Sequence, residues 1–400
     1  MNSFTLALRQ VWRRPLQTLI NALVMGLGVG MVVLLLIGQE QLRDRMSRDA
    51  QGIDLVVGPA GSPMQLILSS VYHLDVPIGN LPLDARERIH QERAVERTIP
   101  LALGDNYHGY RIVGTEPAYA ELYEAELREG GFWAGDFQAV VGAAAAEGTG
   151  LGLGDQFEGM HGLGDGGPVH GEHPYEVVGV LERTGSVLDR LILTSVESVW
   201  AVHDHGHDNG HGHVDEDQGH EVTAILVQYA SPMAAARLPQ MIDGDTPWQA
   251  ARPAHESARL FAMMRPVVDG MAWFAVILVG ASLLGVVTLL YQNLRERRYD
   301  LAVMRAMGGG PGLLFRITLL EGLLMVLAGL LTGLALGHLA CELLGAFSEA
   351  GRSIVLTGWY WADGQWLLTG GILLAGLLVA ILPAWLASRI NVANTLRRGY

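Results

Sequence analysis

The chain has 400 residues, of which 50% are hydrophobic and 17% charged, a balance typical of a membrane protein with a large water-exposed part. All 27 basic residues are arginine, so the lysine-containing phosphate-binding loop of ATPases is absent, and any ATP hydrolysis must come from another chain. The net charge of -14 argues against a nucleic acid partner, and the single cysteine, Cys341, excludes an intrachain disulfide.

Four apolar stretches are long enough to cross a bilayer as helices, which takes roughly 20 residues. They cover residues 16–38, 267–291, 317–344 and 366–388. Arginines precede the first stretch, as they would in a signal peptide. Its apolar run is too long for one, however, and no small-residue cleavage site follows. We therefore expect an uncleaved anchor.

The distribution of arginine predicts the orientation of these spans, because loops rich in arginine stay in the cytoplasm. Residues 1–15 hold three arginines and no acid, the 292–316 loop holds five against two acids, and the 389–400 tail holds three. The 345–365 loop holds only Arg352. We expect both termini and the 292–316 loop in the cytoplasm, with residues 39–266 and 345–365 on the outer side of a bacterial inner membrane.

The large outer segment, residues 39–266, is predicted to be a folded domain. It carries 15 arginines and 34 acids, a net charge of -19. The runs YRIVGTE, QAVVG, YEVVGVLE, RLILTSV and VTAILVQY predict strands, and residues 119–128 and 234–242 predict helices. The fold class is therefore a membrane protein of four transmembrane α-helices, with a large extracytoplasmic α+β domain between the first two.

A histidine-rich tract interrupts this outer domain at residues 203–220. Its imidazoles are those of His203, His205, His207, His211, His213 and His220. Pairs two residues apart can chelate zinc, copper or nickel from an extended chain, and we expect zinc. The glycines between them preform no cage, so ordering the tract costs entropy and the affinity should be modest. The alternative is a solvated loop that binds metal only as any oligohistidine does.

The loop between the second and third spans is predicted to contain a short amphipathic helix. Leu301, Met304, Arg305 and Gly308 recur at helical spacing and set an apolar stripe beside an arginine flank. Such a helix can dock in a groove of a partner protein. The alternative is that the arginines fix the topology and bind anionic lipid.

The third span carries two further candidates. Glu321 lies where this span leaves the cytoplasm, and a carboxylate there is costly unless it faces protein or water, which favours a structural or transmission role over interfacial exposure. Gly329, Gly333 and Gly337 are spaced four apart on one helical face and predict close helix packing, either within one subunit or at a dimer seam.

His338, Cys341 and Glu342 share one helical face near the outer end of the third span, and all three are metal-ligand types. One helix rarely supplies a whole metal site, so chance placement is the preferred interpretation. The sequence contains neither Gly-x-Ser-x-Gly nor His-Glu-x-x-His. We expect no enzymatic activity from this chain.

Several stretches resemble the FtsX/MacB-like ABC transporter permeases. LALRQVWRRPLQTLINALVMGLGVG is similar to the amphipathic N-terminal helix, here residues 1–15, and first span of that family. RERRYDLAVMRAMGGGPGLLFRITLLEGLL is similar to its loop between spans two and three, and LPAWLASRINVANTLRRG to its C-terminal end. RIVGTEPAYAELYEAELREGGFW and VVGVLERTGSVLDRLIL resemble its outer domain. The histidine tract departs from the family pattern.

The resemblance implies a mechanism in which two permease subunits each engage a cytoplasmic ATPase, and nucleotide-driven closure is transmitted through the spans to the outer domains. It places ATPase coupling in the 292–316 loop, at Arg298, Asp300, Leu301, Met304, Arg305, Met307 and Gly308. Glu321 matches an acidic residue that is frequent after this loop in the family. The implied partners are the ATPase, a second permease subunit, the lipid bilayer and a periplasmic protein.

Two other functions remain open at the level of sequence. A non-transporting transducer would use the same architecture to regulate an envelope hydrolase or a sensor kinase. A metal-sensing membrane protein would use the histidine tract and need no ATPase.

Overall fold

The computed structural model describes residues 3–162, 173–204, 220–347 and 356–389. The chain forms two compact units, one of residues 1–43 and 264–400 and the other of residues 44–263. We call them the helical unit and the outer unit. The boundary between them falls inside two continuous helices, α2 (Pro15–Asp49) and α9 (Pro253–Glu296), so each helix contributes residues to both units.

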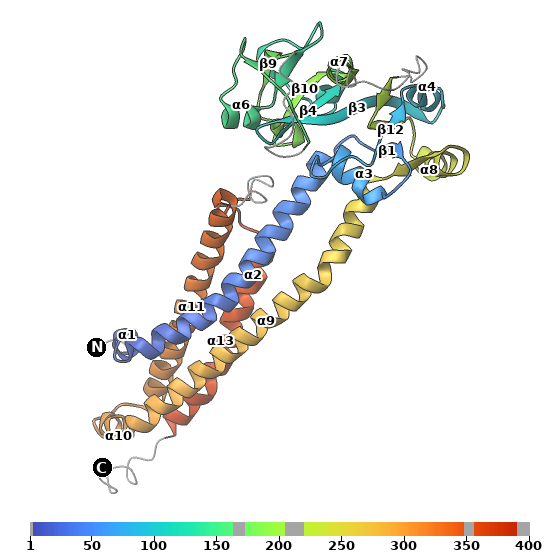
Figure 1. Ribbon diagram of the computed structural model, residues 1–400. Helices are drawn as coiled ribbons and strands as arrows, with labels where there is room; N and C mark the ends of the chain where they lie inside the picture. The colour runs from blue at the N-terminus through green and yellow to red at the C-terminus, as the bar shows by residue number, and fades with distance from the viewer. Residues whose placement is uncertain (1–2, 163–172, 205–219, 348–355, 390–400) are drawn as a thin grey trace. The chain divides into compact units, whose positions relative to one another are not determined.

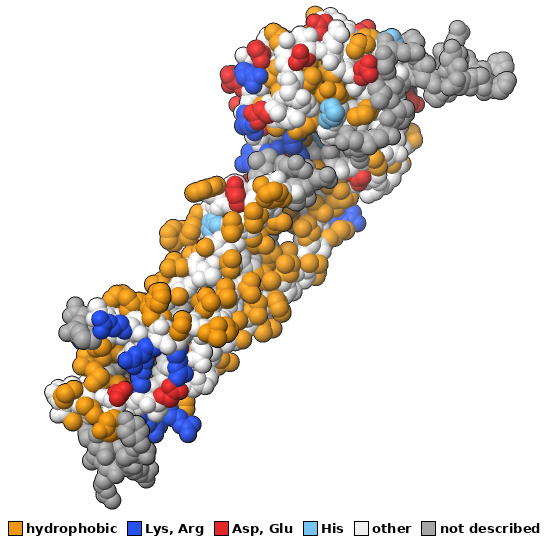
Figure 2. Space-filling model, turned by 60° about the vertical axis from the view of Figure 1, so that its left-hand side comes forward, with side chains coloured by type: hydrophobic (Ala, Val, Ile, Leu, Met, Phe, Trp, Pro, Cys, Tyr) orange, Lys and Arg blue, Asp and Glu red, His pale blue; other side chains and the backbone are white. Residues whose placement is uncertain are grey.

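The helical unit contains four described helices that are long and apolar enough to cross a membrane: α2, α9, α11 (Pro311–Phe347) and α13 (Gly364–Ser388). The four-span prediction is confirmed. The helices extend past the predicted apolar stretches, and α9, with 44 residues, is about 66 Å long at 1.5 Å per residue. Hydrophobic side chains cover much of the surface of this unit in Figure 2, as contact with lipid requires.

Two shorter helices lie at one end of the helical unit. They are α1 (Ser3–Val11), which packs along α11, and α10 (Arg298–Ala306), which follows α9 after one residue. Both are seen at the same end of the bundle in Figure 1. Arginine and acidic side chains gather at that end in Figure 2, whereas the sides of the bundle are apolar.

The glycines of the third span pack inside the subunit. A methyl group added at Gly329 would meet Met25 of α2, one at Gly333 would meet Val29, and one at Gly337 would meet Val33. Because glycine has no side chain, α2 and α11 approach closely along this face. The structure shows packing within one subunit, the first of the two arrangements left open by the sequence.

The described strands of the outer unit form a mixed sheet of eleven strands with the order β13-β1-β12-β3-β4-β10-β6-β9-β5, while β7 pairs with β9 and β8 with β3. Their bounds are β1 Leu55–Pro59, β3 Val95–Tyr107, β4 Tyr110–Thr115, β5 Leu127–Gly130, β6 Gln138–Val141, β7 Gln156–Phe157, β8 Met160–His161, β9 Tyr175–Leu181, β10 Leu191–Ser195, β12 Ala224–Tyr229 and β13 Trp248–Ala251. A separate ribbon pairs β2 (Leu81–Pro82) with β11 (Glu221–Val222). All five predicted strand runs are strands in the structure.

Helices of the outer unit connect these strands. They are α3 Pro63–Ser70, α4 Asp84–His90, α5 Ala118–Glu121, α6 Ala143–Thr149, α7 Val196–Asp204, α8 Ala234–Asp245 and the 3-10 turn η1 Val187–Arg190. The helix predicted at 234–242 is confirmed as α8. The one predicted at 119–128 is wrong beyond residue 121, because Glu124 takes a left-handed backbone (φ 51°) and the chain continues into β5, which pairs with β9.

Two hydrophobic cores stabilise the outer unit. The first core gathers Leu55 and Val57 of β1, Ile225 and Val227 of β12, and Leu238 of α8. The second core lies under the other half of the sheet and contains Ile112, Val141, Phe157, Tyr175 and Val180, among others. The turn between β9 and β10, residues 182–190, therefore connects two strands of the second core.

Candidate functional site

The short helix α10 presents part of its surface to solvent. Arg298, Asp300, Met307 and Gly308 are exposed, and the Met307 side chain reaches 77% exposure. Met304 and Arg305 are half-buried. Leu301, which the sequence placed on the docking stripe, is buried in the structure.

The end of α10 is shaped by Gly308, which adopts a left-handed backbone with φ 99°. The Gly309 amide donates to the Met304 carbonyl oxygen at 3.0 Å, and the Gly308 amide donates to that of Arg305 at 3.1 Å. These bonds satisfy carbonyl groups that the helix leaves unpaired at its C-terminus. Glycine is favoured at 308 because side chains strain this conformation.

Glu321 of α11 lies close to the start of α10, and its side chain is buried, with 3% of the residue exposed. The Asn293 side-chain amide of α9 donates to Glu321 Oε1 at 2.7 Å. Gln10 of α1, with its amide oriented so that both ends are paired, donates to Glu321 Oε2 at 2.9 Å and accepts from Arg297 Nη1 at 3.1 Å. Glu321 thus joins α1, α9 and α11.

Arg297 connects this network to α10, because it is the residue between α9 and α10. Its partial burial lowers the pKa of its guanidinium group, while the Glu321 carboxylate opposes that shift. A second link is the ion pair between Arg14, at the start of α2, and Glu296 at the end of α9. Polar contacts therefore lead from the residue before α10 into α1, α9 and α11, and from the end of α9 to the start of α2.

The histidine tract lies mostly outside the described residues, which include neither His205, His207, His211 nor His213. His203 belongs to α7, and His220 precedes β11. The ring centroid of Trp200 in α7 lies 4.2 Å from that of His220, and Trp200 Nε1 donates to the Glu221 carbonyl oxygen at 2.6 Å. The two ends of the tract are therefore held close together. Among the described residues, no group of three or more His, Cys, Asp or Glu is arranged to hold a metal ion.

His338 and Glu342 both bind the turn that precedes α13. His338 Nδ1 donates to the Gly358 carbonyl oxygen at 2.5 Å, and the Gly358 amide donates to Glu342 Oε2 at 2.8 Å. Gln41 of α2 binds the same turn, accepting from the Thr357 amide at 2.9 Å and donating to its carbonyl oxygen at 2.7 Å. The turn that precedes α13 is thus hydrogen-bonded to both α2 and α11.

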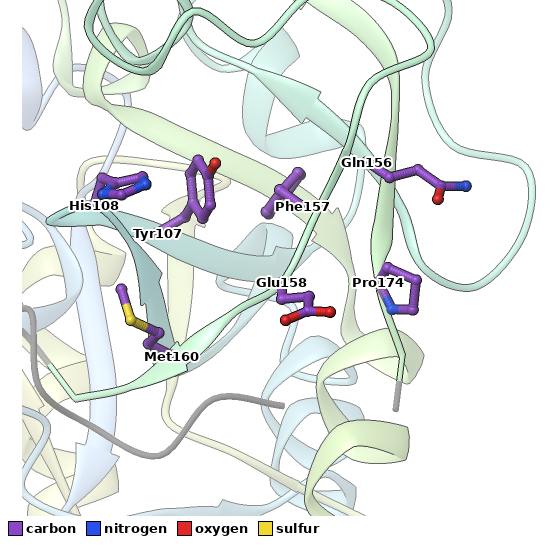
Figure 3. A pocket seen from close by; sticks show the side chains of 7 residues that line it. All are labelled: Tyr107, His108, Gln156, Phe157, Glu158, Met160 and Pro174. Atoms are coloured by element: carbon purple, nitrogen blue, oxygen red, sulfur yellow. The ribbon is translucent and has the colours of Figure 1, made fainter. Parts of the chain in front are cut away.

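A pocket of about 470 Å³ opens on the outer unit beside the β3–β4 turn. Figure 3 shows its lining residues, which are Tyr107, His108, Gln156, Phe157, Glu158, Met160 and Pro174. The ring centroids of Tyr107 and Phe157 lie 4.9 Å apart, and Phe157 stacks on Tyr175 at 5.4 Å. None of the described residues predicted as site residues lines it, so the pocket was missed by the sequence analysis.

Comparison with known proteins defines the class of the molecule. The sequence model of the MacB-like periplasmic core domain matches residues 18–243, more than half of the chain, and that of the FtsX-like permease C-terminal domain matches residues 272–392. The chain therefore belongs to the FtsX/MacB-like ABC transporter permease family and is a multi-pass membrane protein.

Three individual proteins that resemble this chain share at most 28% of the compared residues with it. An uncharacterized ABC transporter permease of Methanocaldococcus jannaschii is 28% identical over 125 residues, which are 30% of this chain and 30% of that protein. The periplasmic region of MacB from Actinobacillus actinomycetemcomitans has a TM-score of 0.34 at 11% identity, covering 53% of this chain and 95% of that one. The extracellular domain of the transporter YknZ from Gram-positive bacteria has a TM-score of 0.31 at 15% identity, covering 50% and 99%.

Proposed function

We propose that this chain is the permease subunit of an ABC system that works with a separate ATPase, to which α10 docks. The observation that carries the proposal is the combination found at α10: an exposed surface with Arg298 and Met307, joined through Arg297 and Gln10 to the buried Glu321. An amphipathic helix that presents an apolar and a basic side chain suits a groove in a partner protein. The chain itself contains no lysine for a phosphate-binding loop.

Motion imposed on α10 would reach the outer unit through the network around Glu321. Asn293 belongs to α9, which continues into the outer unit, and Gln10 belongs to α1, which leads into α2. The arginine distribution supports an orientation with α10 and both termini in the cytoplasm, so the outer unit would do its work on the periplasmic side of the inner membrane. A periplasmic protein or substrate would receive that work.

The ABC arrangement also requires a second permease subunit, either a copy of this chain or a related one. The glycine face of α11 is occupied by α2, so the dimer would use another surface. Exposed apolar side chains of α2, such as Leu16, Leu19 and Leu23, are available to a second subunit or to lipid.

Co-purification of the ATPase tests the docking assignment. The full chain is isolated from its native membrane with its bound ATPase, and Arg298→Glu and Met307→Asp are compared with the wild type. One variant places a new carboxylate on the exposed surface of α10 and the other places one directly after its last residue, so we expect each to lose the ATPase. Arg9→Glu is the matched control, because Arg9 is an exposed arginine on α1 at the same end of the bundle.

Loss of the ATPase in both α10 variants but not in the control supports the docking assignment. Retention of the ATPase by both α10 variants contradicts it. Equal loss of the ATPase in the Arg9→Glu control would show that any charge reversal at this end of the bundle weakens binding, which would contradict a specific role of α10.

We further propose that the histidine tract binds zinc on the outer side. Six imidazoles within residues 203–220 support this, together with the Trp200 contacts to His220 and Glu221, which hold the residues that flank the tract close together. Neutral imidazole suits zinc, and protonation competes with it. Calorimetric zinc titration of the full chain, intact and with residues 204–219 deleted, tests this. Equal binding by the two proteins would show that the tract is not the ligand source.

A further inference from the structure

The last turns of α2 carry a buried ion pair that belongs to the outer unit. Arg45 Nε lies 3.4 Å from Asp49 Oδ1, one helical turn along, and the two side chains are 7% and 3% exposed. Burying two charges costs free energy that their attraction does not always recover, so such a pair is weak support for a role in stability alone. The question is what else these charges contact.

The rest of the Arg45 guanidinium group reaches the turn between β9 and β10. Arg45 Nη1 donates to the Gly185 carbonyl oxygen at 3.2 Å, and Nη2 donates to that of Ser186 at 3.1 Å. From the other end of the same turn, Arg190 Nη2 lies 3.5 Å from Asp49 Oδ2. Two residues of α2 are thus joined to this turn at both of its ends, by hydrogen bonds from Arg45 and by an ion pair with Arg190.

The turn itself is held in one shape by Asp189, which is buried. Its carboxylate accepts from the Thr184 amide at 2.8 Å and from the Gly185 amide at 2.9 Å. The Ser186 hydroxyl accepts from the Leu188 amide at 3.4 Å. Because the turn is fixed internally, the carbonyl groups that meet Arg45 are preorganised acceptors.

Neighbouring contacts place the end of α2 against other elements of the outer unit. The Tyr123 hydroxyl donates to the Asp49 carbonyl oxygen at 2.6 Å. The Tyr72 hydroxyl lies 2.6 Å from the hydroxyl of Ser257 in α9, with which it shares a hydrogen bond, and 3.5 Å from the Met46 carbonyl oxygen of α2. The ends of both long helices therefore meet at Tyr72.

The order of elements along the chain shows which part of the outer unit the ion-pair contacts add to the attachment of α2. After α2 the backbone runs directly into β1, so α2 is joined covalently to the first core. The β9–β10 turn connects two strands of the second core, and its first residue, 182, lies 133 positions after Asp49 in the sequence. Within the described residues, Arg45 and Asp49 supply the ion pair and carbonyl contacts between α2 and that turn.

We propose that Arg45, Asp49 and Arg190 form a clamp that makes the second core follow the end of α2. They are positioning residues, through which a displacement of α2 reaches both halves of the outer unit instead of the first core alone. The proposal rests on the proposed function for the source of that displacement, whereas the clamp itself can be tested without nucleotide.

Distances between spin labels in the full chain test the clamp. With the native cysteine replaced (Cys341→Ala), labels at Ser47→Cys and Glu176→Cys report α2 against the second core, and labels at Ser47→Cys and Gln240→Cys report α2 against the first core. All three label positions are exposed. The chain is studied in nanodiscs, first alone and then with its co-purified ATPase and ATP plus vanadate.

The test variant is Arg45→Met with Asp49→Leu, which removes both charges together and so avoids leaving one buried without its partner. The matched control is Arg265→Met with Asp269→Leu, the same residue types at the same spacing in a pair that is 80% and 59% exposed. Arg190→Met is the second test variant in case the first does not fold, since it leaves the Arg45–Asp49 pair in place.

We expect one narrow 47–176 distance distribution in the wild type and the control, with and without nucleotide, and loss of that narrow peak in the clamp variants. The distribution of distances between residues 47 and 240 should stay narrow in every variant. The backbone joins α2 directly to β1, and β1 packs with α8 in the first core. An unchanged 47–176 peak in the folded clamp variants overturns the proposal. If no ATPase co-purifies, the proposed function fails, while the nucleotide-free distances still decide the clamp.

Discussion

Glu321 and His73 are buried polar residues that differ in their hydrogen-bond partners. Glu321 accepts hydrogen bonds from Asn293 and Gln10, so its neighbours supply donors. His73 lies in the outer unit with 8% of its surface exposed, and its Nε2 shares a hydrogen bond with the Tyr119 hydroxyl at 3.1 Å. Its backbone is left-handed, with φ 53°, which is uncommon for a side chain of this size.

The stability of the outer unit should fall in mild acid because of His73. Burial lowers the pKa of His73 well below the ordinary histidine value of 6.5, and the guanidinium groups of Arg111 and Arg190 lower it further. As the pH falls below 6.5, the unfolded chain binds this proton and the folded one does not, so the free energy of unfolding drops by up to about 1.4 kcal/mol per pH unit. Above pH 6.5 this residue is neutral in both states, and the free energy of unfolding no longer changes with its protonation.

Thermal unfolding of the full chain at about pH 7.5 and about pH 5.5 measures this effect. His73→Asn, chosen because asparagine tolerates a left-handed backbone, should start from a lower melting temperature and show a smaller drop on acidification. An identical drop in the variant and the wild type would assign the acid sensitivity to other groups.

Removal of the Glu321 carboxylate should be costly for a different reason. Glu321→Leu leaves the amides of Asn293 and Gln10 without their acceptor, and a buried unpaired donor costs about 1–3 kcal/mol. We expect faster hydrogen exchange in α1, which would lose one of its attachments. Glu296→Gln is the comparison, because the Arg14 and Glu296 side chains are 29% and 58% exposed, and ion pairs open to solvent contribute less than about 1 kcal/mol. Equal exchange rates in α1 for the two variants would contradict the role assigned to Glu321.

At the scale of elements, the spans were predictable because their apolar runs exceed the thickness of the bilayer. The long strand β3 was not predicted. It carries Pro100 and Gly104, which disfavour central strands, yet it pairs with both β12 and β4. The clamp could not be predicted from the sequence either, because residue 190 comes close to residues 45 and 49 only in the folded domain. For Glu321 the sequence indicated the residue, but its partners Gln10 and Asn293 carry no distinguishing pattern.

The packing of α2 on α11 leads to a prediction about glycine. Gly333→Ala places a methyl group against Val29, and overpacking of this kind costs about 1–3 kcal/mol. The better helix propensity of alanine returns only about 0.5–1 kcal/mol, so the variant should be less stable in detergent titration. Gly280→Ala in α9 is the control, because a methyl group there meets nothing within 4 Å and should be neutral or stabilising. Equal stability of the two variants would show that α2 and α11 pack less closely than the structure shows.

For the whole molecule, the arginine distribution predicts an orientation in the membrane that labelling can test. Met233 in the outer unit and Met307 after α10 are both methionines with highly exposed side chains, at 80% and 77%. In a Cys341→Ala background, Met233→Cys should react with an impermeant maleimide added to intact spheroplasts. Met307→Cys should react only after permeabilisation. The reverse pattern would place α10 outside and exclude a cytoplasmic ATPase as its partner.

An ATPase bound at α10 is proposed to drive this permease, and ATP hydrolysis in nanodiscs measures whether it does. With that arrangement we expect background hydrolysis by the purified chain alone, hydrolysis by its complex with the co-purified ATPase, and return to background for material prepared with Met307→Asp. Hydrolysis by the chain alone, or a fully active complex with Met307→Asp, would contradict it.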